Sequence, residues 1–208
     1  MRIIAIGAHL DDIEIASAGL IADAVTEGNT VKMLVMSKCN WQGEKNVRVR
    51  ESKNAANILG VDDLEILDFS DGEIPYNSNS VNAIEKRVNE FKPDIILTHW
   101  PYDTHQDHQR VSHASISACR YYNKILLYEP MMPSGRSYKG FRNQFYYPVS
   151  REGVKKKKEA LMAYKSQYKK YGKKVWTDAV QSRGRYRGYE ISNDYAECFE
   201  VMRWELDL

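Results

Sequence analysis

The sequence predicts an α/β protein with a Rossmann-like, mostly parallel sheet, flanking helices and an active site at the carboxyl ends of the strands. Apolar runs alternate with segments of helical periodicity through about the first 128 residues, as in successive strand–helix units. The first run, residues 3–8, is continuously apolar, which is typical of a strand buried on both faces. Charged residues follow this run at once, in the segment IGAHLDDIEI.

Each element of the first part of the chain follows from these patterns in order. Apolar residues at three- and four-residue spacing after the first strand predict a helix over 13–24. The same reasoning predicts a strand at 30–37, a helix at 48–59, a strand at 64–69, a helix at 81–91, a strand at 94–100, a helix starting near His105 and a strand at 124–129. Gly60 is a stop signal for the second of these helices.

The last third of the chain carries weaker signals. Residues 143–150 have strand character, and Ser150 can cap a helix that carries Val154, Leu161, Tyr164 and Tyr168. Residues 183–194 are loop-like, and residues 195–204 fit either a strand or a helix. No repeat or linker divides the sequence, so we expect a single domain over residues 1–208.

The composition of the chain indicates which partners and which cellular compartment to expect. The formal net charge of +2 does not indicate a nucleic-acid partner. No apolar stretch approaches the roughly 20 residues of a membrane span, and the first residues lack a signal-peptide pattern. Three widely spaced cysteines, Cys39, Cys119 and Cys198, are interpreted as free thiols. We therefore expect a cytoplasmic protein, for which a homo-oligomer is compatible with the sequence.

The first charged cluster places His9, Asp11, Asp12 and Glu14 within six residues. A dinucleotide site would need G-x-G-x-x-G here, but the turn has only Gly7, and its carboxylates would repel a phosphate. Helix capping by Asp11 or Asp12, with Glu14 at the positive end of the helix dipole, is one explanation. Capping does not account for His9, which could converge with Asp12 on a metal ion.

A second cluster follows the strand at 94–100, in LTHWPYDTHQDHQRV. His105 and His108 lie three residues apart, with Asp103 and Asp107 beside them and His99 further back. The carboxyl ends of the first and fourth strands can lie together, so the clusters could share one site. Two His and one Asp would be the three protein ligands of a catalytic zinc site, which lowers the pKa of bound water toward about 7. Asp11 would remain as a base and His105 as an acid, the equipment of a metal-assisted amide hydrolase.

With these motifs, the chain resembles the PIG-L/LmbE-like family of zinc-dependent N-acetylglucosaminyl de-N-acetylases. The family motifs A-H-P-D-D-x-E and H-P-D-H match AHLDDIE and HQDH, with Leu10 and Gln106 in place of the prolines. RVRESKNAANILG, FSDGEI and NDYAECF resemble three further family segments, so the resemblance covers nearly the whole chain. Many members carry a His where this chain has Tyr164, which puts substrate contacts on that side in doubt.

The resemblance implies removal of the acetyl group from an N-acetylated amino sugar, free or linked to a nucleotide or lipid, with release of acetate and an amine. It implies one zinc ion per chain, held by His9, Asp12 and His108. Asp11 would be the general base, and His105 the oxyanion partner and general acid, oriented by Asp107. The residues near the sugar would be Glu14, Arg48 and Asp71.

Two other functions stay open from the sequence. One is a zinc amidase that acts on a non-sugar or thiol-conjugate amide, and the other is a non-catalytic metal- or nucleotide-binding module. A basic segment, residues 151–176, has ten Lys and Arg against two Glu. It is either a solvated helix face or a site for a phosphate group on the substrate.

Overall fold

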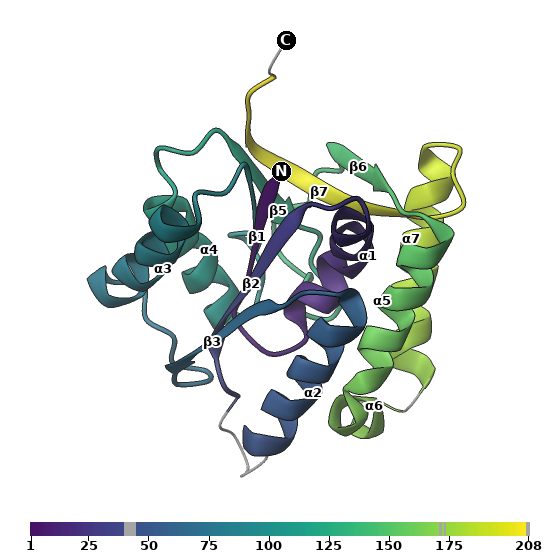
Figure 1. Ribbon diagram of the computed structural model, residues 1–208, viewed down its shortest axis with the longest axis horizontal. Coiled ribbons are helices and arrows are strands. Elements are labelled where there is room, and N and C mark those ends of the chain that lie inside the picture. The colour runs from purple at the N-terminus through teal and green to yellow at the C-terminus, as the bar shows by residue number, and fades with distance from the viewer. Residues whose placement is uncertain (40–44, 171, 173, 207–208) are drawn as a thin grey trace.

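The computed structural model describes residues 1–39, 45–170, 172 and 174–206. A seven-stranded sheet with the order β3-β2-β1-β4-β5-β7-β6 lies between two layers of helices (Figure 1). Five strands are parallel: β1 (Arg2–Gly7), β2 (Thr30–Ser37), β3 (Asp63–Phe69), β4 (Ile95–Thr98) and β5 (Lys124–Tyr128). β7 (Ala196–Trp204) runs antiparallel to both β5 and β6 (Phe145–Pro148). The predicted α/β fold with a mostly parallel sheet is confirmed.

Helices cover both faces of the sheet. α3 (Ser78–Phe91) and α4 (Gln106–Ala118) lie on one face. The other face is covered by α1 (Asp12–Thr26), α2 (Lys45–Leu59) and α5 (Arg151–Ala163), followed by α6 (Lys165–Lys170) and α7 (Lys174–Glu190). Alternate residues of β1 enter the two cores, Ile3 with the α1 layer and Ile4 with the α3–α4 layer. Burial on both faces explains the continuous apolar run of this strand.

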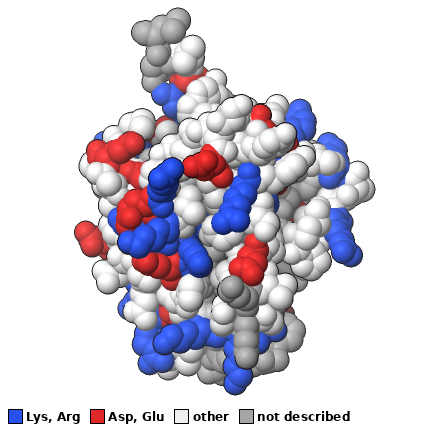
Figure 2. Space-filling view, turned by 90° about the vertical axis from the view of Figure 1, so that its right-hand side faces the viewer, with Lys and Arg blue, Asp and Glu red and all other residues white. Residues whose placement is uncertain are grey.

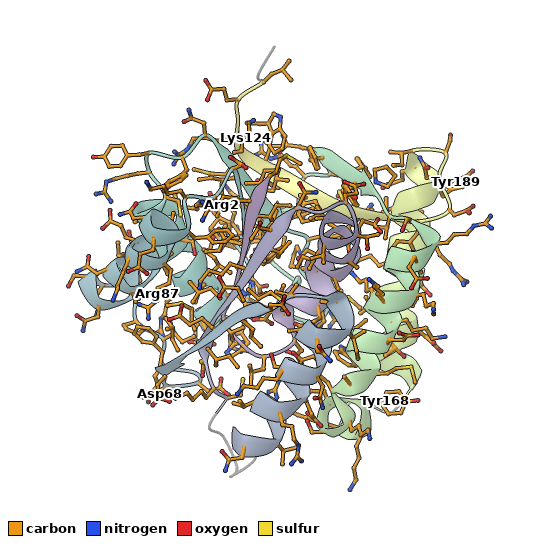
Figure 3. All side chains as sticks on the ribbon, in the orientation of Figure 1. Arg2, Asp68, Arg87, Lys124, Tyr168 and Tyr189 are labelled. Atoms are coloured by element: carbon orange, nitrogen blue, oxygen red, sulfur yellow. The ribbon has the colours of Figure 1, made fainter. Side chains whose placement is uncertain are left out.

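The five parallel strands all begin at one end of the sheet and finish at the other, carboxyl end. Figure 3 labels Arg2 and Lys124 where β1 and β5 begin, and Asp68 near the end of β3, at the opposite edge of the molecule. α5 runs antiparallel to α1, because Ser150 N–H donates to Asp23 near the end of α1, whereas Tyr164 donates to Glu14 at its start. The end of α5 therefore lies at the edge where the parallel strands end.

Two expectations for the last third of the chain are corrected. Residues 183–194 were expected to be loop-like, but α7 continues to Glu190. Its glycines serve close packing: a Cβ at Gly184 would lie 2.0 Å from the Tyr195 ring, and one at Gly188 would lie 2.4 Å from the Tyr195 backbone nitrogen. The helix capped by Ser150 ends at Ala163, so Tyr168 belongs to α6. Residues 195–204 mainly form strand β7. No helix in the described part of the chain is long and apolar enough to cross a membrane.

Candidate active site

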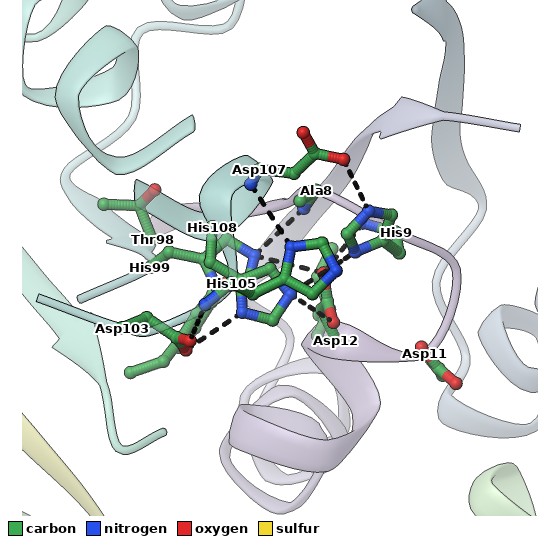
Figure 4. A network of polar contacts seen from close by, with 12 residues as sticks. Ala8, His9, Asp11, Asp12, Thr98, His99, Asp103, His105, Asp107 and His108 are labelled. Carbon is green, nitrogen blue, oxygen red and sulfur yellow. Dashed lines mark hydrogen bonds and ion pairs between the residues drawn. The ribbon is translucent and has the colours of Figure 1, made fainter. Parts of the chain in front are cut away.

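Two loops meet at the carboxyl edge of the sheet, because β1 and β4 are neighbours. The backbone N–H of Ala8 donates to His99 Nε2 at 3.0 Å, which ties the loop after β1 to the loop after β4. His9, His99, His105 and His108 form a compact group in which the ring centroids of successive neighbours lie 4.1–5.3 Å apart (Figure 4). The two sequence clusters thus form one site.

The three side chains predicted as metal ligands lie close together, with the two imidazoles beside different oxygens of the Asp12 carboxylate. His9 Nδ1 lies 3.3 Å from His108 Nε2 and 3.5 Å from Asp12 Oδ2, and His108 Nε2 lies 3.4 Å from Asp12 Oδ1. A tetrahedral zinc site with bonds of 2.0–2.1 Å has ligand–ligand distances of about 3.3–3.4 Å. Two imidazole nitrogens and one carboxylate are ligands that zinc accepts, and their separations are close to these distances, so the residues present fit a zinc ion.

Each predicted His ligand has a carboxylate on its other ring nitrogen. His108 Nδ1 lies 2.9 Å from Asp103 Oδ2, and His9 Nε2 lies 3.0 Å from Asp107 and 3.1 Å from Asp71. Such carboxylates fix the orientation of metal-binding imidazoles and raise their basicity. Sequence reasoning gave Asp103 no role. Its position in the His-rich segment was the only signal, and the contact depends on how the loop after β4 folds.

The carboxylate of Asp107 has a different partner from the one we expected. It accepts hydrogen bonds from the N–H groups of Gly72 and Ile74 and contacts His9, so it does not orient His105. Only the backbone N–H of Asp107 reaches His105, donating to Nδ1 at the N-cap of α4. This bond leaves the proton of a neutral His105 ring on Nε2. Burial, followed by the imidazoles of His108 and His9, lowers the pKa of His105.

Asp11 is buried at the N-cap position of α1, but its side chain makes no capping hydrogen bond there, so capping does not explain it. Its backbone has a φ of 114°, in the left-handed region. In Figure 4 its carboxylate points away from the imidazoles. It pairs with Arg48 Nη2 at 3.2 Å, and Arg48 also donates to the carbonyl of Leu10. Burial raises the pKa of Asp11 to about 6, although Arg48 opposes the rise.

Glu14 lies beneath the site, with only 1% of its surface exposed. The hydroxyl of Tyr164, itself fully buried, donates to Glu14 Oε1 at 2.7 Å. Burial raises the pKa of Glu14 to about 7, against the lowering effect of the Tyr164 hydrogen bond. Asp71, by contrast, is partly exposed and lies beside His9. Of the three residues predicted near a sugar, Asp71 is the most open to a ligand.

The site as a whole favours a cation. Burial lowers the pKa of His108, but the carboxylates of Asp12 and Asp103 outweigh this effect and raise it to about 9. The carboxylates of Asp107, Asp12 and Asp71 likewise raise the pKa of His9 against the effect of burial. His99 differs, because burial and the neighbouring His108 lower its pKa to about 4. A bound metal ion would displace the protons from His9 and His108.

Comparison with known proteins bears on this site. The model of the PIG-L family, described as GlcNAc-PI de-N-acetylase, matches residues 4–119. The uncharacterized deacetylase YaiS of Escherichia coli (strain K12) is 34% identical to the chain, over 79% of the chain and 90% of its own length. Diacetylchitobiose deacetylase of Thermococcus kodakarensis is 26% identical, over 94% of the chain and 81% of its own length.

Solved structures share the fold at lower identity. The conserved protein TT1542 from Thermus thermophilus has a TM-score of 0.83 and 22% identity, over 99% of this chain and 96% of its own. GalB, the 4-carboxy-2-hydroxymuconate hydratase from Pseudomonas putida KT2440, has a TM-score of 0.82 and 17% identity, over 100% of this chain and 98% of its own. A hydratase has the same fold, so the fold alone does not identify an activity, whereas the side chains of the site can.

Proposed function

The chain belongs to the PIG-L family, and on this premise we propose that it is a zinc-dependent hydrolase of an N-acetylated amino sugar, releasing acetate and a free amine. The observation that carries the proposal is the close approach of His9, Asp12 and His108: the two imidazole nitrogens lie 3.3 Å apart, and each lies 3.4–3.5 Å from one oxygen of the Asp12 carboxylate. The diacetylchitobiose deacetylase among its relatives supports a sugar amide as the substrate class.

In this proposal His9, Asp12 and His108 hold the ion, with Asp103 and Asp107 orienting the two imidazoles. A zinc ion bound there supplies a Lewis acid and lowers the pKa of water to about 7. This arrangement places hydrolytic chemistry at the carboxyl edge of the sheet, where open α/β sheets bind their ligands.

Asp11 is the proposed general base. In the structure its carboxylate pairs with Arg48, so this role requires it to turn toward the predicted ligands, where it would take a proton from the attacking water. Burial raises the pKa of Asp11 to about 6 while it pairs with Arg48, which brings this carboxyl closer to neutrality than an ordinary Asp and suits a general base. His105 donates from Nε2 to the carbonyl oxygen of the acetyl group as negative charge develops on it. The leaving nitrogen needs a proton, which Asp11 or His105 could supply, and the lowered pKa of His105 favours Asp11.

The residues proposed to contact the sugar differ in access. Asp71 is partly exposed beside His9, and Arg48 becomes available once Asp11 turns away. Both side chains can hydrogen-bond sugar hydroxyls. Glu14 can reach a sugar only if Tyr164 moves, because that hydroxyl covers it. We therefore assign Asp71 and Arg48 to the substrate more directly than Glu14.

Only part of the basic segment, residues 151–176, could bind a phosphate group on the substrate. Lys157 is buried in an ion pair with Glu197 at 2.5 Å, which removes it from any ligand. Arg151 and Lys155 lie in the first half of α5, toward the edge away from the site. Figure 2 shows acidic side chains among basic ones over the middle of this face, with basic ones prevailing at its lower end. A nucleotide- or lipid-linked sugar would therefore have to use the basic residues in the second half of α5 and in α6.

A substrate screen tests the proposed function. Zinc-loaded protein is incubated with N-acetylglucosamine, diacetylchitobiose and a nucleotide-linked N-acetyl sugar, and acetate and free amine are quantified. The expected result is equimolar release of both products from at least one sugar, and none by the Asp11→Asn variant. Release from N-acetylated amino acids or thiol conjugates alone would instead favour the non-sugar amidase. Bound metal without turnover on any amide would favour the non-catalytic module.

A further inference from the structure

His99 is a buried imidazole to which the proposed mechanism gives no role. It follows β4 directly, and only 5% of its surface is exposed. Figure 4 shows its ring beside that of His108, close to the predicted metal ligands. Buried polar groups are paired in folded proteins, so the contacts of this ring indicate what it does.

The residue is fixed from the side away from the metal ligands. Its carbonyl accepts a hydrogen bond from Ser112 Oγ of α4 at 2.6 Å. Its ring makes a T-shaped contact with Tyr128 at the end of β5, with the ring centroids 5.5 Å apart. The Tyr128 hydroxyl in turn donates to the carbonyl of Leu97 in β4. Two strands and a helix therefore hold His99, and a side chain on such rigid elements can position other groups precisely.

The first group that His99 contacts is the turn that carries His9. Nε2 of His99 accepts the N–H of Ala8 at 3.0 Å, at a point three residues beyond the last backbone pair of β1 with β4. The carbonyl of Ala8 accepts from the N–H of Ser37 in β2, also at 3.0 Å. Both backbone groups of Ala8 are thus paired immediately before His9. Because Ala8 is fully buried, loss of the imidazole would leave its N–H without an acceptor.

The same ring contacts the other two predicted ligands. It stacks on His108, with centroids 4.1 Å apart and planes 16° apart, which restricts rotation of the His108 ring. Its Nε2 also lies 3.1 Å from Asp12 Oδ2. Since the N–H of Ala8 points at Nε2, this second contact brings two acceptors together, and a cation bound to Asp12 would weaken their repulsion. All three contacts of His99 therefore favour the arrangement that holds an ion.

We propose that His99 is a positioning residue for the metal site, which fixes the turn before His9 and the ring of His108 so that ligands from two loops face one ion. This inference rests on the proposed function, which needs that ion, and deepens it. His99 itself is not a ligand, because its Nε2 accepts the N–H of Ala8. It sets the affinity for zinc and takes no part in the hydrolytic step.

The test is a zinc titration of the full chain in competition with a chromogenic chelator, at a temperature where thermal melting shows every variant to be folded. His99→Phe keeps an aromatic ring but offers no acceptor to the N–H of Ala8. It should bind zinc about 10–100-fold more weakly, the usual loss for a residue that orients a metal ligand. His99→Gln, whose amide oxygen can replace Nε2 as the acceptor, should recover part of this loss. If His99→Phe does not fold, His99→Leu, which also lacks an acceptor, takes its place.

His113→Phe is the matched control, because His113 is an exposed imidazole of α4 that donates to the carbonyl of Gln109. This variant should bind zinc like the wild type. A merely structural His99 would lower the melting temperature of the zinc-free protein and leave the zinc affinity of folded His99→Phe unchanged, and that result overturns the inference alone. Equal losses of affinity in the Gln and Phe variants would overturn it as well. A wild-type protein that binds no zinc would refute the proposed function together with the inference.

Discussion

Replacing Asp103 by Asn should weaken zinc binding without unfolding the chain. The carboxylate is 97% buried and serves two donors with separate oxygens: Oδ1 accepts from His105 N–H at 2.8 Å, and Oδ2 contacts His108 Nδ1 at 2.9 Å. Asn has one acceptor oxygen, so it cannot serve both, and its NH₂ group would face an N–H donor. Loss of such an outer carboxylate typically costs about 10–100-fold in metal affinity, or about 1.4–2.7 kcal/mol.

The assay is a competition titration with a chromogenic zinc chelator at fixed pH, on protein whose folding is checked by thermal melting. Asp62→Asn is the matched control, because Asp62 is an exposed residue before β3. The control should bind zinc like the wild type. A folded Asp103→Asn variant with wild-type zinc affinity would refute the reasoning, because His108 would then need no carboxylate partner.

Three further predictions concern the base, the oxyanion donor and the core. Asp11→Asn should keep stoichiometric zinc but lose about 10²–10⁴-fold in kcat, because an amide cannot accept the proton. His105→Ala should also keep zinc and lose about 10²–10³-fold in kcat with a modest change in KM, as expected for a transition-state donor. Lys157→Met should destabilise the fold by about 3–5 kcal/mol in urea unfolding, because it removes the counter-charge of the buried Glu197 carboxylate, which keeps two backbone N–H donors.

Each of these predictions has a result that would contradict it. Loss of zinc from Asp11→Asn would make Asp11 a ligand and exchange its role with that of Asp12. A normal kcat for His105→Ala would show that this imidazole has no part in catalysis and serves only as the N-cap of α4. Lys158→Met, at an exposed neighbouring position, is the control for Lys157→Met. Equal unfolding free energies for these two variants would show that the buried ion pair contributes little.

The parts of the fold that could be predicted follow from short-range patterns. The continuous apolar run at 3–8 predicted a strand buried on both faces and the pattern at 30–37 a second strand, and β1 and β2 are found there. The glycines of α7 were misinterpreted because Gly is usually a turn signal. Gly184 instead makes room for Tyr195, from a segment that follows the helix, and this contact exists only after β7 joins the sheet. A single sequence does not reveal such long-range packing.

The candidate site also has a part that could be predicted from the sequence and a part that could not. The spacing of His9 with Asp12, and of His105 with His108, can be seen in the sequence. The meeting of these two motifs could be expected as well, because the first and fourth strands of such a sheet can place their carboxyl ends together. The partners of the carboxylates could not be predicted. Asp107 contacts His9 across 98 positions of sequence, and Asp11 pairs with Arg48 from α2. Both pairings depend on which loops meet at the edge of the sheet.

Anomalous diffraction at the zinc absorption edge, from crystals of the zinc-loaded protein, tests the central claim most directly. The account predicts one peak per chain, about 2.0–2.2 Å from His9 Nδ1, His108 Nε2 and a carboxylate oxygen of Asp12. A peak held by Asp71 and Asp107 on the Nε2 side of His9, or no peak near these imidazoles, would contradict the account.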